Sequence, residues 1–129
     1  MPSVPTEITS KDNITYSGYI QKKARGRSFI GRRNWKIRFI TINKYNGDLH
    51  YYTDSDSVAP KGHINIAGSE IKLISNKELN FEVRNKKNES ISFSAFDNNQ
   101  LDAWLLIFKE ASLSAGKLKK IVFIHLMVI

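Results

Sequence analysis

The hydrophobic period of the chain changes once, and this change limits the folds that it can adopt. Seven segments between residues 16 and 95 alternate or carry β-forming side chains, and polar turns separate them. The segments are Tyr16–Lys22, Trp35–Ile42, Leu49–Thr53, Gly62–Ile66, Glu70–Ile74, Asn80–Arg84 and Ser90–Ala95. Asn46-Gly47, after the second segment, is a strong hairpin signal. Short strands that follow one another without helices predict an antiparallel barrel or sandwich.

From residue 97 onward the apolar residues follow the spacing of one helix face. These residues are Leu101, Trp104, Leu105, Phe108 and Ala111. Asp97, Asn98 and Asn99 offer N-capping side chains, and Gly116 is the predicted stop. We therefore expect a mainly β fold, a seven-stranded antiparallel barrel or sandwich capped by one amphipathic α-helix, with Trp104 in the core.

The two ends of the chain differ from this pattern. Residues 1–15 contain two prolines and show no clear periodicity, so we expect a flexible arm. Residues 16–115 form the predicted domain, and 116–129 form a basic and apolar tail without an assigned structure. Its apolar run, Ile121–Ile129, is too short to span a bilayer, which needs about 20 residues. The absence of cysteine excludes disulfides and thiolate metal sites.

The positive charge is concentrated in residues 22–38, which hold eight basic residues and no acidic one. The whole chain has 20 Lys and Arg against 12 Asp and Glu, so the remaining residues carry 12 charges of each sign. An excess this local predicts a polyanionic partner.

The strand predicted over residues 35–42 has two distinct faces. Trp35, Ile37, Phe39 and Thr41 share one face, whereas Lys36, Arg38, Ile40 and Ile42 share the other. Lys36 and Arg38 therefore point the same way. We expect the face of Trp35 to be the inward one.

These segments resemble, in order, those of the pleckstrin homology (PH) domain family over about residues 16–113. Gly18 to Lys22 is similar to the first strand of the family, Trp35 to Ile42 to the second and Leu49 to Tyr52 to the third. Pro60 to Ile64 resembles the start of the fourth strand, and Trp104 stands where the helix of the family carries its tryptophan.

The resemblance extends to the phosphoinositide-binding subset, whose pattern K-Xn-[KR]-X-R corresponds to Lys22, Lys36 and Arg38. It implies that these residues bind headgroup phosphates. Tyr51 and Lys61 stand where members that bind 3-phosphorylated lipids have further phosphate contacts. The first loop departs from the small, glycine-rich form of the family because it is strongly basic. Its expected roles are membrane attraction and insertion, by Arg25, Arg27, Phe29, Ile30, Arg32 and Arg33.

The first hypothesis is a membrane-targeting module that binds anionic lipids, phosphoinositides above all. The alternative is a protein-interaction (adaptor) module without specific lipid binding. A nucleic-acid binder is a third hypothesis, which the placement of Trp35 on the expected inward face disfavours. The sequence shows no nucleophile–base pair and no metal-ligand spacing among His50, His63 and His125, so we expect no enzyme, cofactor or metal. We expect a monomer in the cytoplasm, associated peripherally with membranes.

Overall fold

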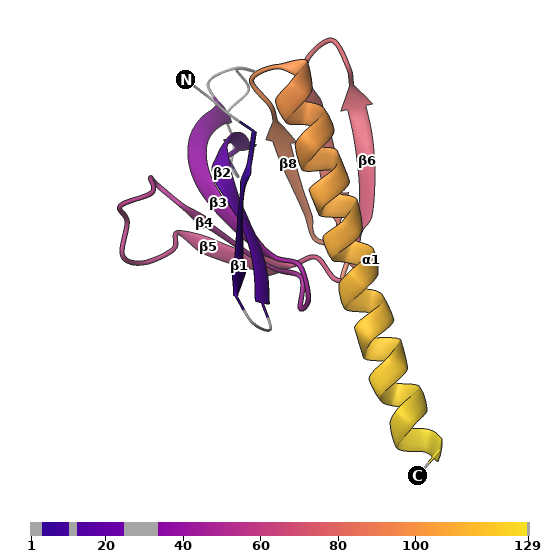
Figure 1. The fold of residues 1–129 in the computed structure, drawn as a ribbon. Coiled ribbons are helices and arrows are strands. Elements are labelled where there is room, and N and C mark those ends of the chain that lie inside the picture. Colours follow the sequence, from indigo (N-terminus) through magenta and orange to yellow (C-terminus); the bar gives the residue numbers. More distant parts are fainter. Residues whose placement is uncertain (1–3, 11–12, 25–33, 129) are drawn as a thin grey trace.

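The structure is a computed structural model that describes residues 4–10, 13–24 and 34–128, with side chains through residue 114. This part holds eight strands followed by one helix (Figure 1). In order they are β1 (Thr6–Ser10), β2 (Asn13–Lys23), β3 (Trp35–Asn43), β4 (Asp48–Tyr52), β5 (Gly62–Asn65), β6 (Glu70–Ser75), β7 (Asn80–Arg84), β8 (Ser90–Ser94) and α1 (Asn98–Val128).

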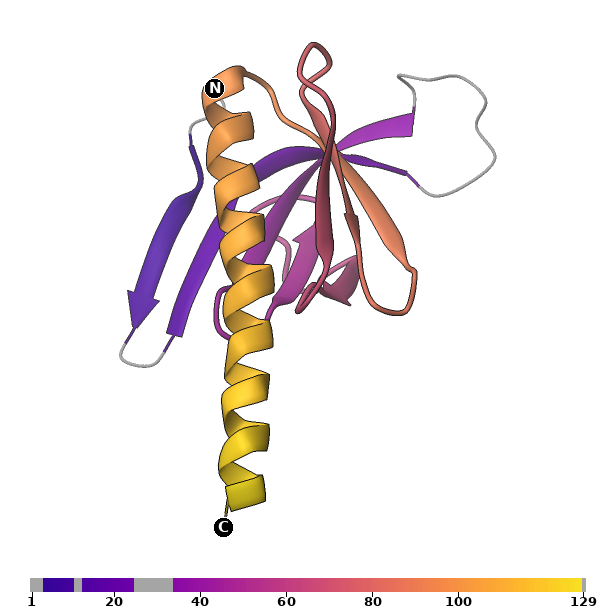
Figure 2. The ribbon, with the colours of Figure 1, turned by 90° about the vertical axis from the view of Figure 1, so that its right-hand side faces the viewer.

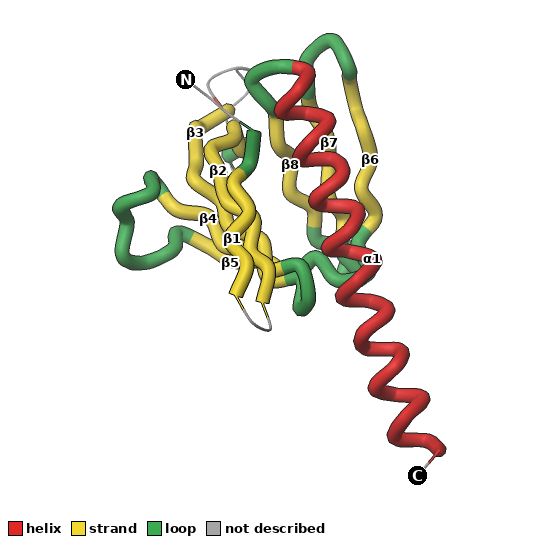
Figure 3. The backbone as a smooth tube through the Cα atoms, viewed as in Figure 1, coloured by secondary structure: helices red, strands yellow, loops and turns green. Residues whose placement is uncertain are grey.

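Seven of the strands form one antiparallel path in the order β5-β4-β3-β2-β8-β7-β6, and β1 pairs with β2 beside it. β2 joins β8 through only two residue pairs, Gln21 with Ser94 and Lys22 with Phe93. The sheet therefore bends at this junction into two layers, as Figure 3 shows, with α1 beside β6 and β8. The predicted fold class, a seven-stranded antiparallel sandwich with one C-terminal helix, is confirmed, and β1 is an additional strand.

The turn between β3 and β4 follows directly from its sequence. Gly47 has a φ of 76°, a value that glycine adopts at no steric cost. The Asn43 side-chain oxygen accepts hydrogen bonds from the backbone N–H groups of Tyr45, at 2.9 Å, and Asn46, at 3.0 Å. The predicted hairpin is confirmed, and it fixes the register of β3 against β4.

The start of α1 is anchored to the sheet. Asp97 caps the helix, because its carboxylate accepts a 2.7 Å hydrogen bond from the backbone N–H of Gln100. The buried Gln100 side chain donates to the backbone oxygen of Tyr19 in β2, at 2.8 Å. Trp104 is fully buried, as expected, and a Cβ added at Gly18 would lie 3.1 Å from its ring. The absence of a side chain at Gly18, in β2, thus makes room for the ring of Trp104.

The expected inward face of β3 is wrong. Ile40 and Ile42 are fully buried, whereas Ile37 is 48% exposed and Trp35 is half-buried on the outer face. Both faces of this strand carry apolar residues, so its alternation defines two faces without showing which one meets the core. The outer face is instead stabilised by a row of aromatic contacts, in which the ring of Phe39 lies 5.2 Å from that of Tyr19 and 6.4 Å from that of Tyr52.

Both ends of the chain also differ from expectation. Residues 6–10, expected in a flexible arm, form β1, which pairs from Thr6–Ser17 to Ser10–Asn13 along β2. These backbone hydrogen bonds do not require an apolar pattern, and all five residues of β1 are exposed.

The predicted helix stop at Gly116 is wrong as well, because α1 continues to Val128. A glycine inside a helix costs only about 1 kcal/mol, and Ala115, Lys117 and Leu118 around it favour helix.

The C-terminal half of α1 projects beyond the strands in both views (Figures 1 and 2). It points away from the ends of β2 and β3 that flank residues 25–33. Within the described residues, no helix is both long and apolar enough to cross a membrane.

Candidate functional site

The inward faces of β2, β3 and β4 change from apolar to polar at the same end. In β2 the buried Ile20 is followed two residues later by Lys22, and in β3 Arg38 precedes the buried Ile40. The register aligns these positions, because Lys22 pairs with Lys36, Ile20 with Arg38 and Ile40 with Tyr51. Residues that would otherwise continue the core therefore present charge at the open end of the sandwich.

These polar ends line a pocket of about 220 Å³, which we call the basic cup. Its lining residues are Lys22, Ala24, Lys36, Arg38, Tyr51 and Lys61. The structure thus brings together all five residues that the sequence predicts as headgroup ligands, from four separate segments. Their binding role stays a prediction, but their convergence is a property of the fold.

Lys22 is the most enclosed cation of the basic cup, with 7% of its surface exposed. Its ammonium nitrogen lies 4.5 Å from the centroid of the Tyr51 ring and 3.4 Å from the backbone oxygen of Lys23. A buried ammonium needs such polar or aromatic partners, because burial removes its hydration. Lys22 is therefore held inside the wall of the cup and does not extend into solvent.

Arg38 and Lys61 also line the cup, from β3 and from the segment before β5. The Arg38 guanidinium donates a 2.9 Å hydrogen bond to the backbone oxygen of Ile37, which leaves other N–H groups of its fork for a ligand. Lys61 is brought to the cup by its backbone N–H, which donates to the Tyr51 backbone oxygen at 2.7 Å. Lys36 and Lys61 are both exposed.

The lining of the basic cup is positively charged. No aspartate or glutamate is among its six lining residues. Within the described part of the chain, the ion pairs join His63 to Asp48 and Arg84 to Glu82, and neither pair touches the cup. Four cations converging on a lining that contains no carboxylate favour a compact anion that carries several negative charges.

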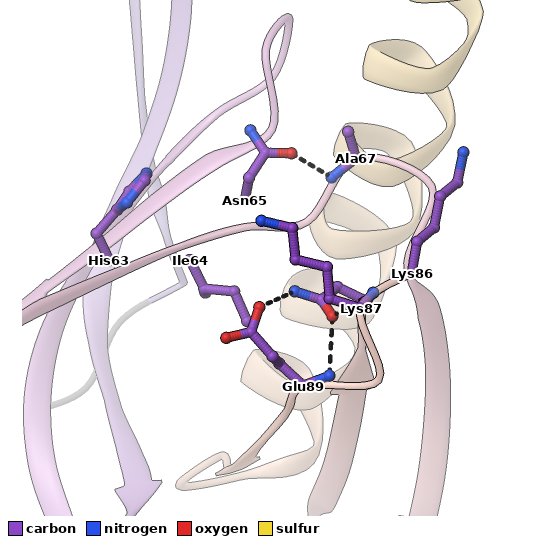
Figure 4. A pocket seen from close by; sticks show the side chains of 8 residues that line it. His63, Ile64, Asn65, Ala67, Lys86, Lys87 and Glu89 are labelled. Atoms are coloured by element: carbon purple, nitrogen blue, oxygen red, sulfur yellow. Dashed lines mark hydrogen bonds between the residues drawn. The ribbon is translucent and has the colours of Figure 1, made fainter.

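Two larger hollows have mixed linings. One of about 410 Å³ lies between the end of β5 and the β7–β8 turn, where Lys86, Lys87 and His63 stand with Glu89 (Figure 4). Another, of about 810 Å³, combines Lys77 with Glu78 and with apolar residues such as Phe96. A glutamate in each lining makes them weaker candidates for an anion than the basic cup.

A hydrogen-bonded group at the β4–β5 edge borders the first of these hollows. Asp48 accepts hydrogen bonds from Asn65, at 2.8 Å, and from His63, at 3.2 Å. Burial raises the pKa of the Asp48 carboxyl, but these two hydrogen bonds and the nearby histidines outweigh that effect and hold the pKa below its ordinary value. In the described residues, no group of three or more His, Cys, Asp or Glu side chains could hold a metal ion.

The residues predicted to attract and enter the membrane lie outside the described residues. They are Arg25, Arg27, Phe29, Ile30, Arg32 and Arg33. Sequence reasoning also missed Gly62, which pairs with Tyr51 in the β4–β5 register. The available signal was a glycine directly opposite an aromatic residue on a neighbouring strand, and it becomes visible only when the register is known.

The fold and this site identify the class of protein. The family model of the PH domain matches residues 14–113, so the chain belongs to the PH domain family. The membership in this family that the strand patterns predict is confirmed.

Curated relatives match most of the chain. Src kinase-associated phosphoprotein 1 of Rattus norvegicus is 30% identical over 100 residues, which cover 73% of this chain and 27% of the relative. Src kinase-associated phosphoprotein 2 of Danio rerio is 25% identical over 109 residues, covering 80% of this chain and 31% of the relative. The chain thus spans about a quarter to a third of the length of these relatives.

Solved structures share the fold. The PH domain of human oxysterol binding protein-related protein 11 superimposes with a TM-score of 0.70 at 20% identity, over 85% of this chain and 89% of that one. The C-terminal PH domain of pleckstrin, solved in complex with D-myo-Ins(1,2,3,5,6)P5, gives a TM-score of 0.66 at 21% identity, over 86% and 100% of the two chains.

Proposed function

We propose that the chain is a membrane-targeting module whose basic cup binds the phosphorylated headgroup of a phosphoinositide. The observation that carries the proposal is the convergence of Lys22, Lys36, Arg38 and Lys61 on one small pocket without a carboxylate. The complex of the pleckstrin C-terminal PH domain with an inositol pentakisphosphate supports it, because a similar fold accepts a ligand of this chemistry.

The proposed ligand matches the chemistry of the cup. Inositol phosphates place several dianionic groups on a small, rigid ring. Arg38 can grip one phosphate with two parallel hydrogen bonds, and the lysines supply compact positive charges. Hydrogen bonds to charged groups contribute about 1.5–3 kcal/mol each, so three or four of them are sufficient for micromolar affinity. The presence of Lys61 in the same pocket supports a preference for 3-phosphorylated lipids.

The proposal includes peripheral association with the cytoplasmic face of a membrane, where anionic lipids attract basic segments. Arg25, Arg27, Arg32 and Arg33 add positive charge next to the cup in the sequence. Each contributes about 1 kcal/mol near an anionic surface, and this attraction does not select a headgroup. Phe29 and Ile30, in the middle of the same stretch, add apolar surface that can enter the interface.

Co-sedimentation with vesicles at physiological salt, with and without phosphoinositides, tests the proposal. Arg38→Ala should abolish the phosphoinositide-dependent part of binding, whereas Arg27→Ala should weaken binding to all anionic vesicles. Arg84→Ala is the matched control, because Arg84 pairs with Glu82 on β7 and is absent from the cup. Equal, salt-sensitive losses for Arg38→Ala and Arg27→Ala would reduce the site to a general basic surface.

A second candidate function is protein interaction, and the open edge of β5 favours it. Within the described part of the sheet, β5 pairs only with β4, and the hollow of about 410 Å³ in Figure 4 borders it. An extended peptide can add to such an edge as a strand. The relatives named Src kinase-associated phosphoproteins fit this alternative. Binding of acidic peptides that Lys86→Glu abolishes, without any response to phosphoinositides, would favour it over the lipid proposal.

A further inference from the structure

Tyr51 and Gly62 are packed as a unit at the base of the basic cup. The two residues pair directly across β4 and β5. A Cβ atom added at Gly62 would overlap the hydroxyl and the ring of Tyr51. The tyrosine side chain therefore leans across the glycine backbone, in space that any other residue would fill.

The same ring also contacts Lys22, whose ammonium nitrogen lies over it, 4.5 Å from the ring centroid. The face of an aromatic ring is electronegative, so it attracts a cation placed over it. The Tyr51 hydroxyl, in contrast, lies against Gly62 and makes no hydrogen bond with the described residues. Gly62, Tyr51 and Lys22 thus form a stack, in which the hydroxyl end of the tyrosine packs against Gly62 and its ring lies beneath the ammonium.

We propose that Gly62 is a positioning residue of the headgroup site, and that Tyr51 serves it through its ring and not through its hydroxyl. This inference rests on the proposed function and specifies how the site is built. Gly62 lets the ring lie low, and the ring holds the Lys22 ammonium toward the ligand. Tyrosine at this position was expected to contact phosphate directly, so the two roles make different predictions.

A side chain at position 62 would close the cup. The ring of Tyr51 cannot move toward the core, because Ile40, its partner on β3, is fully buried. A ring displaced from Gly62 must move toward Lys22 and Arg38, into a pocket of only about 220 Å³. Gly62 therefore controls access to the cup although it offers no side chain to the ligand.

Isothermal titration calorimetry with soluble inositol 1,3,4,5-tetrakisphosphate distinguishes the contribution of the Tyr51 ring to binding from that of its hydroxyl. Tyr51→Phe should bind within about twofold of the wild type, because the ring remains. Tyr51→Leu should bind about tenfold more weakly, the equivalent of a cation–π contact in a desolvated site. A loss in Tyr51→Phe as large as that in Tyr51→Leu would overturn the inference.

A double substitution tests the role of Gly62. Gly62→Ala should weaken binding by about tenfold or more, whereas Gly62→Ala combined with Tyr51→Leu should bind as Tyr51→Leu alone, because no ring remains to be displaced. Gly68→Ala is the control for general strain, since Gly68 has a φ of 69° and lies away from the cup. It should lower the melting temperature without changing affinity. Additive losses in the double variant, or wild-type affinity of Gly62→Ala, would overturn the proposal.

A ligand-independent signal distinguishes this inference from the proposed function. The ring current of Tyr51 should shift the ε-methylene protons of Lys22 upfield in NMR spectra of the wild type and of Tyr51→Phe. The shift should vanish in Tyr51→Leu, which has no ring, and should change in Gly62→Ala, where the ring is displaced. Failure of the wild type to bind the probe would overturn the proposed function and the binding role of the stack, even if these shifts are observed. Ordinary Lys22 shifts in a wild type that binds would overturn only the stack.

Discussion

Lys22 occupies a position where the requirements of the core and of a ligand compete. It follows Ile20 on the inward face of β2. Its partner on the neighbouring strand β8 is the fully buried Phe93. An apolar residue would pack there without the loss of hydration that a buried ammonium suffers. The proposed binding role therefore explains this lysine better than a contribution to folding does.

We predict that Lys22→Met leaves the free energy of unfolding unchanged or raises it by about 1 kcal/mol, because a volume-conserving apolar residue replaces a buried charge. The same change should weaken the binding of a soluble inositol polyphosphate at least tenfold. Urea unfolding followed by circular dichroism gives the first quantity, and calorimetry gives the second. The neighbouring Lys23→Met, at an exposed position, should change neither by much. A strong loss of stability in Lys22→Met would show that the ammonium is a structural group.

Asp48 gives the fold a defined response to acid. Because the pKa of its carboxyl is lowered in the folded state, its ionised form stabilises the fold fully above the ordinary pKa of 3.8. This contribution disappears as the pH falls through the lower folded-state pKa. Asp48→Asn should therefore flatten the decline in unfolding free energy below about pH 4. Chemical unfolding of both proteins between pH 2 and pH 6 measures this, and equal slopes would contradict the assignment.

Sequence patterns predict which residues share a face, but they do not show which face is buried. In β3 we expected the face of Trp35 to be the inward one, and this was wrong because both faces carry apolar groups and the buried one is that of Ile40. The choice depends on the closure of the two layers through Gln21 and Lys22, which no local pattern contains. The candidate ligands were nevertheless predictable, because Lys36 and Arg38 share a face whichever side is buried. Gly62 was not, because its importance arises only from the register with Tyr51.

At the scale of elements, α1 has two parts with different surroundings. Its first four turns contribute Leu101, Trp104, Phe108 and Ala111 to the core, and Ser112 donates a 2.8 Å hydrogen bond to the backbone oxygen of Ser69. The backbone beyond residue 114 continues the helix away from the strands (Figure 2). The helical pattern was predictable because burial of one face imposes it. Its length was not, because beyond the sheet only local propensity acts.

We predict that a chain ending at residue 114 keeps its fold and its binding. Among the described side chains, the buried contacts of α1 and its anchor through Gln100 precede that point. The melting temperature should change by less than about 5 °C, whereas the helical signal in circular dichroism should fall in proportion to the residues removed. A chain ending at residue 103 lacks Trp104 and Phe108 and serves as the contrasting variant, which should not fold. Unfolding of the 1–114 chain would show that the projecting half of α1 is a stabilising element.

The whole molecule is polarised in space. The basic cup lies where β2 ends and β3 begins, and the C-terminal end of α1 lies at the opposite end in both views (Figures 1 and 2). If the cup faces a membrane, α1 directs its C-terminus away from that surface. This geometry disfavours the use of the terminal apolar run as a second anchor on the same membrane.

Because the chain contains no cysteine, single cysteine variants carrying an environment-sensitive dye can test this orientation. Ile37 lies on the outer face of β3, between Lys36 and Arg38 in the sequence, and is 48% exposed. The emission of a dye at Ile37→Cys should therefore shift to the blue when phosphoinositide vesicles are added. A dye at Val128→Cys, the last helical residue, should keep its aqueous spectrum. Combining each label with Arg38→Ala should remove the response at position 37. A blue shift at position 128 would place the end of α1 on the membrane and require a bound orientation in which the helix lies along the surface.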